Sequence, residues 1–347
     1  MKKPDKTRTR IKDIAERTGY SIATVSRVIN ESGIYYSKET YRKIKKAVEE
    51  LNYHPDAIAR GLKIKRTFNI AFLEPWNSEF FAEIFKGIQV AANKKGYSVA
   101  IFSSNYNESQ EDRNIKAILS NRHDGVIIPV AVIKKSSIEK LIQQKIPLVL
   151  IEKIITDTEI PVVSIKNLEI SQKAVSYLID LGHKKIGFMG EPLEVGKMDS
   201  RFKGYKAALN ARNIKFNPEF VFIDEKFKGE NFSTSYKYIV ENIDKIRHCT
   251  ALFITSDKIS ITAIKVFKEH GLEVPRDVSI IGFDGLEISK YVIPSLTTVV
   301  QPRYDMGFEA MKMLIEIINK GNTRSVELKA ELSIGQSTAP PATKKHH

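Results

Sequence analysis

The chain has 347 residues, of which 42% are hydrophobic and 28% are charged, and Cys249 is its one cysteine. These fractions are typical of a globular protein with about two or three domains, and no apolar run reaches the roughly 18 residues of a membrane span. A lone cysteine excludes an intrachain disulfide, and no apolar segment follows the basic N-terminus, so we expect a cytoplasmic protein without a signal peptide.

The net charge of +14 is unevenly distributed along the chain, because residues 1–66 hold 17 Lys and Arg against 8 Asp and Glu, a net charge of +9. This concentration predicts a phosphate-binding segment attached to a nearly neutral body, rather than a basic tail that only aids solubility.

Residues 11–30, IKDIAERTGYSIATVSRVIN, have the pattern of two short helices joined by a tight turn. Each half carries an apolar stripe at helical spacing, formed by Ile11, Ile14 and Ala15 and then by Val25, Val28 and Ile29. Gly19 can take the left-handed conformation that ends many helices, and Ser21 can cap the next helix. The pattern predicts a helix-turn-helix, whose second helix can enter the major groove of DNA, although two helices of an ordinary bundle would share it.

A third helix is predicted over residues 38–51, where apolar side chains are spaced to cover the first two helices. Its outer side is basic, which suits either phosphate contacts or a solvated face. The next segment, residues 55–66, has enough Ala and apolar residues for two helical turns, which is too short for a stable isolated helix.

Three stretches carry a resemblance to a known family: KDIA at 12–15, ATVSRVIN at 23–30 and NYHPDAIARGLK at 52–63. They resemble the headpiece of the lactose-repressor (LacI/GalR) family of bacterial transcription regulators, and the resemblance covers nearly the whole chain. It implies a DNA-binding headpiece at 1–54, a hinge helix at 55–66 that folds when two copies pair on the operator, and a ligand-binding and dimerisation core at 67–340. It also implies that Leu62 enters the minor groove and kinks the DNA, next to a tightly packed Ala59. A disordered tether is the alternative for this hinge.

The outward side of the second predicted helix contains the candidate DNA contacts. Arg27 can present a two-pronged fork to guanine, whereas Ile22 and Ala23 can make only apolar contacts, for instance with thymine methyl groups. The resemblance implies that these three residues read the bases and that Arg10 occupies the position of a backbone-contacting threonine. Short polar side chains suited either to phosphates or to helix capping complete the set: Ser21, Thr24, Ser26 and Asn30.

From Phe68 onward, short apolar runs alternate with amphipathic helical patterns, which indicates parallel sheets covered by helices on both faces. The resemblance implies a periplasmic-binding-protein-like α/β core of two doubly wound parallel-sheet subdomains, joined to the all-α helix-turn-helix headpiece and its hinge helix. We place the three crossings between subdomains near 160–167, 288–297 and 321–328. The N-subdomain then spans about 67–163 and 296–321, and the C-subdomain about 164–290 and 327–340.

Polar and aromatic residues at the predicted strand ends are the candidate ligand contacts, because open α/β sheets bind ligands at the carboxyl ends of their strands. The resemblance implies that Arg201 and Asp284 grip the effector, that Phe232 stacks on it, and that Glu152 and Ser256 also reach it. Structural roles remain open for Arg201 as an ion pair and for Phe232 as core. The set is completed by Trp76, Phe80 and Asp257, of which Asp257 also suits a helix N-cap. In the first loop Glu79 stands where the family usually has a proline.

No P-loop, dinucleotide-binding glycine motif, metal-ligand spacing or paired nucleophile and base is present, so we predict a non-enzyme without cofactor or metal. The sequence predicts a homodimeric, sequence-specific regulator that binds a pseudo-palindromic operator in double-stranded DNA, without a membrane partner. We expect it to repress carbohydrate-utilisation genes and to bind a sugar or sugar derivative in the cleft of the core. The alternatives are a purine or nucleoside effector, a protein corepressor, a secreted solute-binding protein and a non-specific DNA binder.

Overall fold

A computed structural model describes most of the chain, namely residues 9–30, 36–53, 66–76, 78–129, 135–152, 159–192, 197–321 and 323–342. The chain forms two compact units, Met1–Thr67 and Phe68–His347. Among the described helices, none is long and apolar enough to cross a membrane.

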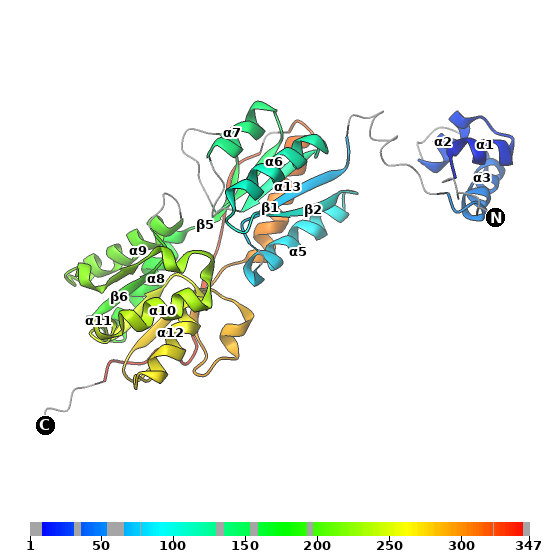
Figure 1. Ribbon diagram of the computed structural model, residues 1–347. Helices are drawn as coiled ribbons and strands as arrows, with labels where there is room; N and C mark the ends of the chain where they lie inside the picture. Colours follow the sequence, from blue (N-terminus) through cyan, green and yellow to red (C-terminus); the bar gives the residue numbers. More distant parts are fainter. Residues whose placement is uncertain are drawn as a thin grey trace, which may run out of the picture. The chain divides into compact units, whose positions relative to one another are not determined.

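The first unit packs three helices around a small apolar core: α1 Ile11–Thr18, α2 Ile22–Ile29 and α3 Lys38–Glu50 (Figure 1). The turn between α1 and α2 has the chemistry that the sequence predicts, since Gly19 has a φ of 75° and its N–H donates to the carbonyl of Ala15. The hydroxyl of Ser21 accepts a hydrogen bond from the backbone N–H of Thr24 at 3.1 Å, which caps α2. The core contains Ile14, Val25, Val28, Ile44 and Ala47, so the predicted apolar stripes do face one another.

The predicted hinge helix cannot be compared with the structure. Residues 54–65, which include Ala59 and Leu62, lie outside the described residues. Its wedge role therefore stays a prediction.

The second unit begins with a six-stranded parallel sheet in the order β11-β5-β4-β3-β1-β2, which defines the N-subdomain. Its strands are β1 Asn69–Glu74, β2 Ser98–Ser103, β3 Gly125–Pro129, β4 Leu148–Ile151, β5 Val162–Ile165 and β11 Val326–Leu328. Helices α5 Glu79–Asn93 and α13 Arg303–Ile318 pack on one face of this sheet, and α6 Glu108–Ser120 and α7 Lys135–Gln143 pack on the other. The Val- and Ile-rich central strands are buried on both faces, which explains their continuous apolar runs.

The C-subdomain contains a second six-stranded sheet in the order β12-β10-β9-β8-β6-β7, in which only β12 runs antiparallel to its neighbour. Its strands are β6 Ile186–Gly190, β7 Val221–Ile223, β8 Ala251–Ile254, β9 Ser279–Asp284, β10 Thr297–Val300 and β12 Glu331–Ser333. Its helices are α8 Asn167–Asp180, α9 Lys197–Ala211, α10 Phe232–Glu241, α11 Ile243–Ile246 and α12 Asp257–Glu269. Short 3₁₀ turns η1 Pro218–Phe220, η2 Glu225–Glu230 and η3 Glu287–Lys290 connect them.

Helices α5 and α13 pack against each other unusually closely, and Figure 1 shows them beside the first sheet. A Cβ atom on Gly87 would lie 2.0 Å from the carbonyl oxygen of Tyr304, and one on Gly307 would lie 1.9 Å from that of Ile84. Only glycine allows backbones to approach in this way, so the two helices form a tight pair in the N-subdomain.

Two predicted subdomain assignments are wrong. Strand β10 pairs with β9 and β12 in the C-subdomain, although residues 296–321 were placed in the N-subdomain. Strand β11 pairs with β5 in the N-subdomain, although residues 327–340 were placed in the C-subdomain. The chain thus crosses after β5, after β10 and after β11. Helices α10 and α11 are separated at Asn242.

Candidate functional site

Helix α2 presents its candidate DNA contacts on the side away from the headpiece core. Ile22, Ala23 and Arg27 are exposed, while Val25 and Val28 are completely buried. Ile22 is a large apolar side chain that is exposed to solvent at the first position of α2. The N-terminal residues of recognition helices are those that contact base edges. The inward and outward sides of α2 are therefore those that the sequence predicts.

Most of the short polar candidates in α2 have hydrogen-bond partners within the headpiece. Besides capping α2, the hydroxyl of Ser21 lies 2.9 Å from that of Thr24. The side-chain amide of Asn30 donates to the carbonyl of Ser26 at 2.8 Å. Arg10 is exposed at the N-cap of α1, and its backbone N–H donates to the carboxylate of Asp13 at 2.7 Å. These residues shape the helix ends, which is the capping role left open by the sequence.

In the second unit, Arg201 lies at the carboxyl ends of the strands and is 1% exposed. Its Nε donates to the side-chain oxygen of Asn167 at 3.0 Å, and its Nη1 donates to the carbonyl of Thr255 at 3.0 Å. The guanidinium also lies 3.6 Å from the centre of the Phe283 ring. All these partners belong to the C-subdomain, so the arginine is held in one orientation there.

Glu152 approaches Arg201 from the end of β4 in the N-subdomain. Its carboxylate oxygen lies 3.6 Å from Nη2 of Arg201, and the two side chains are 3% and 1% exposed. No described residue donates a hydrogen bond to either oxygen of Glu152 or accepts one from Nη2. Glu152 also has a φ of 73°, which is costly for a residue with a side chain and is typical of functional sites. The pair connects the two subdomains but leaves hydrogen-bonding capacity at both groups.

Asp284 ends β9 with a φ of 118°, and two residues of the crossing that follows β10 hold it. Gln301 donates from Nε2 to the Asp284 carboxylate at 2.9 Å. Arg303 donates to the backbone carbonyls of Asp284 and Gly285 at 3.1 and 3.0 Å. Gln301 and Arg303 are not among the residues predicted from the sequence, although their position just after an apolar strand is a usable signal.

Asp257 has a structural role in the C-subdomain. Its carboxylate accepts hydrogen bonds from the Leu286 backbone at 2.7 Å, the Ser289 hydroxyl at 2.8 Å and the Thr298 hydroxyl at 2.5 Å. Burial raises the pKa of this carboxyl group. The prediction that Asp257 caps α12 is wrong by one residue, because the cap is Ser256, whose hydroxyl accepts from the Lys258 backbone at 3.3 Å. The carboxylate instead points back to the β9 loop.

The two aromatic candidates that follow β1 pack with their neighbours. Trp76 stacks on Tyr106 and meets Phe81 edge to face, each with ring centres 4.9 Å apart. Its indole N–H is buried, and no described residue accepts a hydrogen bond from it. Phe80 is buried against Phe81, with Arg303 5.9 Å from its ring centre. The Trp76 N–H thus remains without an acceptor among the described residues, whereas Phe80 mainly supports the packing.

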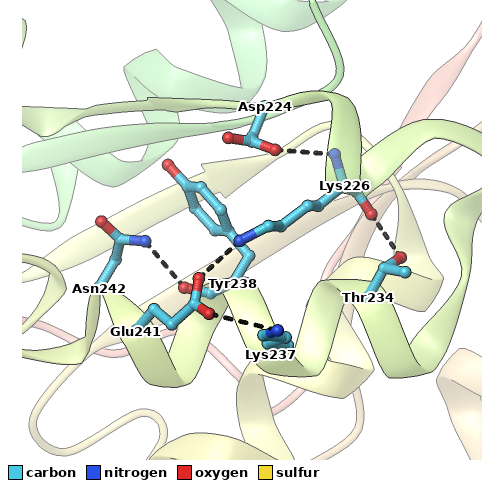
Figure 2. A network of polar contacts seen from close by, with 7 residues as sticks. All are labelled: Asp224, Lys226, Thr234, Lys237, Tyr238, Glu241 and Asn242. Carbon is cyan, nitrogen blue, oxygen red and sulfur yellow. Dashed lines mark hydrogen bonds and ion pairs between the residues drawn. The ribbon is translucent and has the colours of Figure 1, made fainter.

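Phe232 is not a core residue, since it is 54% exposed at the start of α10. Figure 2 shows a polar network that joins Lys226 of η2 to residues near both ends of α10. The Thr234 hydroxyl donates to the carbonyl of Lys226 at 2.6 Å, and the Lys226 ammonium pairs with Glu241 at 2.6 Å. The ion pair lowers the pKa of Glu241. Phe232 is therefore exposed to solvent at the start of α10, a helix that these contacts attach to η2.

Glu79 makes a contact between the subdomains that the sequence did not predict. Its carboxylate accepts a hydrogen bond from the backbone N–H of Glu287 in η3 at 2.8 Å. A surface pocket of about 710 Å³ lies beside this contact, lined by α5, η3 and the crossing into α13. Within the described residues, no three His, Cys, Asp or Glu side chains are grouped so that they could hold a metal ion.

Comparison with known proteins agrees with this arrangement. A family model described as bacterial regulatory proteins, lacI family, matches residues 10–56, and one described as a periplasmic binding protein-like domain matches residues 175–338. The HTH-type transcriptional regulator RegA of Clostridium saccharobutylicum is 33% identical over 90% of this chain and 93% of its own length. The chain belongs to the lacI family. It is accordingly a DNA-binding transcription regulator with an N-terminal helix-turn-helix.

Two solved structures have the same fold. The transcriptional regulator CelR in complex with cellobiose matches with a TM-score of 0.72 and 25% identity, over 95% of this chain and 100% of that one. The lac repressor dimer bound to operator and an anti-inducer matches with a TM-score of 0.83 and 23% identity, over 96% and 100%. The second match bears on the fold alone.

Proposed function

We propose that this lacI-family regulator is a cytoplasmic homodimeric repressor whose operator affinity is changed by an uncharged, hydroxyl-rich effector of the sugar class. The effector binds between the subdomains, where it contacts Glu152 and Arg201. The observation that carries the proposal is the buried pair at 3.6 Å, in which neither Glu152 oxygen receives a hydrogen bond from a described residue.

A ligand hydroxyl suits this pair because it both donates and accepts. It can accept from Nη2 of Arg201 and donate to Glu152, which satisfies two buried groups that are costly to leave without partners. The indole N–H of Trp76 supplies a further donor, and the exposed ring of Phe232 supplies an apolar face. Because Glu152 already counters the charge of Arg201, the pair favours an uncharged ligand over a phosphorylated one. The likeness to CelR in its cellobiose complex supports the same class of ligand.

The same contacts explain how a ligand would change the affinity for DNA. Glu152 lies in the N-subdomain and Arg201 in the C-subdomain, so a bridging ligand stabilises one relative arrangement of the two. Asp284 is held by Gln301 and Arg303, which lie in a crossing between subdomains. A ligand that prefers one closure shifts the equilibrium by its difference in affinity, typically about 1–3 kcal/mol in allosteric proteins.

Homodimerisation follows from how one helix-turn-helix recognises DNA. A single α2 reaches only a half-site, whereas a two-fold dimer matches a pseudo-palindromic operator. The excess positive charge of residues 1–66 supplies phosphate attraction that does not depend on base sequence. Selection from random duplexes at a stated salt concentration tests this directly. A two-fold consensus supports the proposal, and equal binding to all sequences overturns it.

The effector class is tested by a thermal-shift screen against free sugars, sugar phosphates and nucleobases. A ligand that binds only the folded protein raises the melting temperature when its concentration exceeds its Kd. Stabilisation by free sugars alone is the expected result. Stabilisation only by purines or nucleosides would retain the regulator and reject the sugar. Stabilisation only by phosphorylated sugars would reject the uncharged ligand.

Base reading by α2 is tested with Arg27→Ala. If Arg27 contacts guanine through two hydrogen bonds, its loss relaxes selection at one base position and costs about 1–3 kcal/mol. Binding of each single-base operator variant is measured for both proteins. A uniform loss of affinity over all variants would instead identify Arg27 as a phosphate contact.

A further inference from the structure

The headpiece has a surface hollow of about 540 Å³ beside α3. This volume lies within the range of small-molecule sites in proteins, about 300–1,000 Å³. None of the lining residues belongs to α2, the helix with the base-reading candidates. Four of them are basic, two are aromatic and one is acidic: Tyr36, Lys38, Tyr41, Arg42, Lys45, Lys46 and Glu49. We call this site the α3 hollow.

Two stacked tyrosine rings form one part of the α3 hollow. Ser37 caps α3, since its hydroxyl accepts a hydrogen bond from the Thr40 backbone N–H at 3.1 Å. Tyr36 precedes this cap and Tyr41 follows it by four residues, which is the spacing of a hydrophobic staple. The ring centres are 5.9 Å apart with the planes at 12°, and both rings pack on the headpiece core. The Lys45 ammonium lies 5.3 Å from the centre of the Tyr41 ring. The start of α3 therefore holds the rings in place.

Positive charge lines the α3 hollow along the helix. Lys38, Arg42 and Lys46 are spaced by four residues, so they lie on one side of α3, and all three are exposed. They span about 12 Å of the helix axis, at about 1.5 Å per residue. Lys46 approaches Glu50 at 3.8 Å, but these side chains are 75% and 42% exposed, and such surface pairs contribute little. The three cations can therefore face an anionic ligand.

We infer that the α3 hollow binds a nucleoside polyphosphate, with its base on the tyrosine rings and its phosphates on Lys38, Arg42 and Lys46. Every base has an aromatic face, and stacking on aromatic side chains contributes about 1–3 kcal/mol for each base. The guanidinium of Arg42 has paired donors that match phosphate oxygens. The inference goes beyond the proposed function, because this ligand differs from the effector of the core in both chemistry and site.

The combination of rings and cations favours a free nucleotide over the other ligands of a regulator. Double-stranded DNA keeps its base faces stacked inside the duplex, so it would contact the cations and leave the rings unused. An uncharged sugar would leave the cations unused. A nucleoside polyphosphate uses both, and it fits a hollow of this volume.

A nucleotide in the α3 hollow opposes DNA binding through its charge. The attraction between basic side chains and DNA phosphates depends on the positive charge of the headpiece, which a bound polyphosphate lowers. Because coupling between two ligands is reciprocal, bound DNA weakens nucleotide binding by the same factor. The headpiece thereby responds to a signal that does not act through the cleft of the core.

The test is isothermal titration calorimetry of the full-length chain with ATP, adenosine and inorganic tripolyphosphate, at one ionic strength. ATP is a suitable probe because stacking tolerates any base. The variants are Arg42→Gln, which removes a cation, and Tyr36→Leu, which removes a ring but keeps an apolar contact in the staple. Lys12→Gln is the matched control, because Lys12 is a basic side chain of α1 that is 71% exposed. The melting temperature establishes that each variant is folded.

We expect ATP to bind at least ten-fold more tightly than adenosine or tripolyphosphate. Arg42→Gln and Tyr36→Leu should each weaken ATP binding at least ten-fold, and Lys12→Gln should leave it unchanged. Equal affinity for ATP and tripolyphosphate would overturn the role of the rings. An absence of ATP binding, or ATP binding that neither variant weakens, would overturn the site.

Binding to a random-sequence duplex separates the nucleotide from DNA as the ligand of the α3 hollow. ATP should lower the affinity of the unaltered chain for this duplex, and should do so less in Arg42→Gln. If ATP does not bind while Arg42→Gln weakens binding to the duplex, the cations contact the DNA backbone and the nucleotide is rejected. Operator selection and the sugar screen are separate measurements, so either result leaves the proposed function to its own tests.

Discussion

The end of β8 in the C-subdomain and the end of β4 in the N-subdomain each carry a buried acid, Asp257 and Glu152. The Asp257 carboxylate accepts hydrogen bonds from Leu286, Ser289 and Thr298. The Glu152 carboxylate has a cation 3.6 Å away and receives no hydrogen bond from a described residue. Buried polar groups in folded proteins are nearly always hydrogen-bonded, so the second arrangement requires an explanation and the first does not.

The difference in hydrogen bonding between Asp257 and Glu152 distinguishes a structural acid from an acid available for binding, although both follow strands in the sequence. A carboxylate whose partners all come from the protein holds the protein together. A carboxylate with remaining capacity, on a residue with a φ of 73°, is available to a ligand. Changing each acid in turn tests whether this distinction is correct.

Asp257→Ala should have the largest effect, on stability. The change leaves the Leu286 N–H and the hydroxyls of Ser289 and Thr298 without their buried acceptor, and such losses cost about 1–3 kcal/mol for each buried group left unsatisfied. We expect a net loss of about 3 kcal/mol in the free energy of unfolding, measured by urea denaturation. Asp244→Ala is the control, because that side chain is 90% exposed. Similar losses for both variants would show that Asp257 does not anchor the β9 loop.

Glu152→Gln should have a smaller effect on stability and a clear effect on the ligand. The amide retains the shape of the side chain, but it removes the charge opposite Arg201 and one of the acceptors for a ligand hydroxyl. We expect the affinity for the stabilising sugar to fall at least ten-fold, or about 1.4 kcal/mol, by isothermal titration calorimetry. Glu219→Gln, at an exposed position of the C-subdomain, should bind normally. Unchanged affinity in Glu152→Gln would place the ligand elsewhere.

Local features of the fold could be predicted from the sequence because local chemistry determines them. Gly19 and Ser21 form the turn of the helix-turn-helix as expected, and the apolar runs that alternate with helical patterns after Phe68 form strands. These features depend on spacing and backbone preference within a few residues. Helix α2 could accordingly be divided correctly into an inward and an outward side.

Features that depend on distant partners could not be predicted in this way. Ser256 and Asp257 are both good capping residues, and the choice between them depends on Leu286, Ser289 and Thr298, which lie 29 to 41 positions away. Strand β10 was placed in the wrong subdomain because a short apolar strand carries no mark of its sheet. Its pairing with β9 and β12 is a property of the folded core.

Glu74, at the end of β1, is a third buried acid, and changing it should have the smallest effect of the three. Burial raises the pKa of its carboxyl group in the folded protein above that of the unfolded chain. The folded protein then holds a proton at a pH where the unfolded chain has released it, so stability decreases as the pH rises from about 4.5 through the raised pKa. Glu74→Gln should remove this dependence and increase the free energy of unfolding at pH 7.

The measurement is urea denaturation of both proteins between pH 5 and pH 8, in steps small enough to follow the slope. A variant that loses stability at pH 7 would show that the Glu74 carboxylate is stabilised by partners, as Asp257 is. A variant that gains stability would show that the buried Glu74 carboxylate opposes folding, in contrast to Asp257.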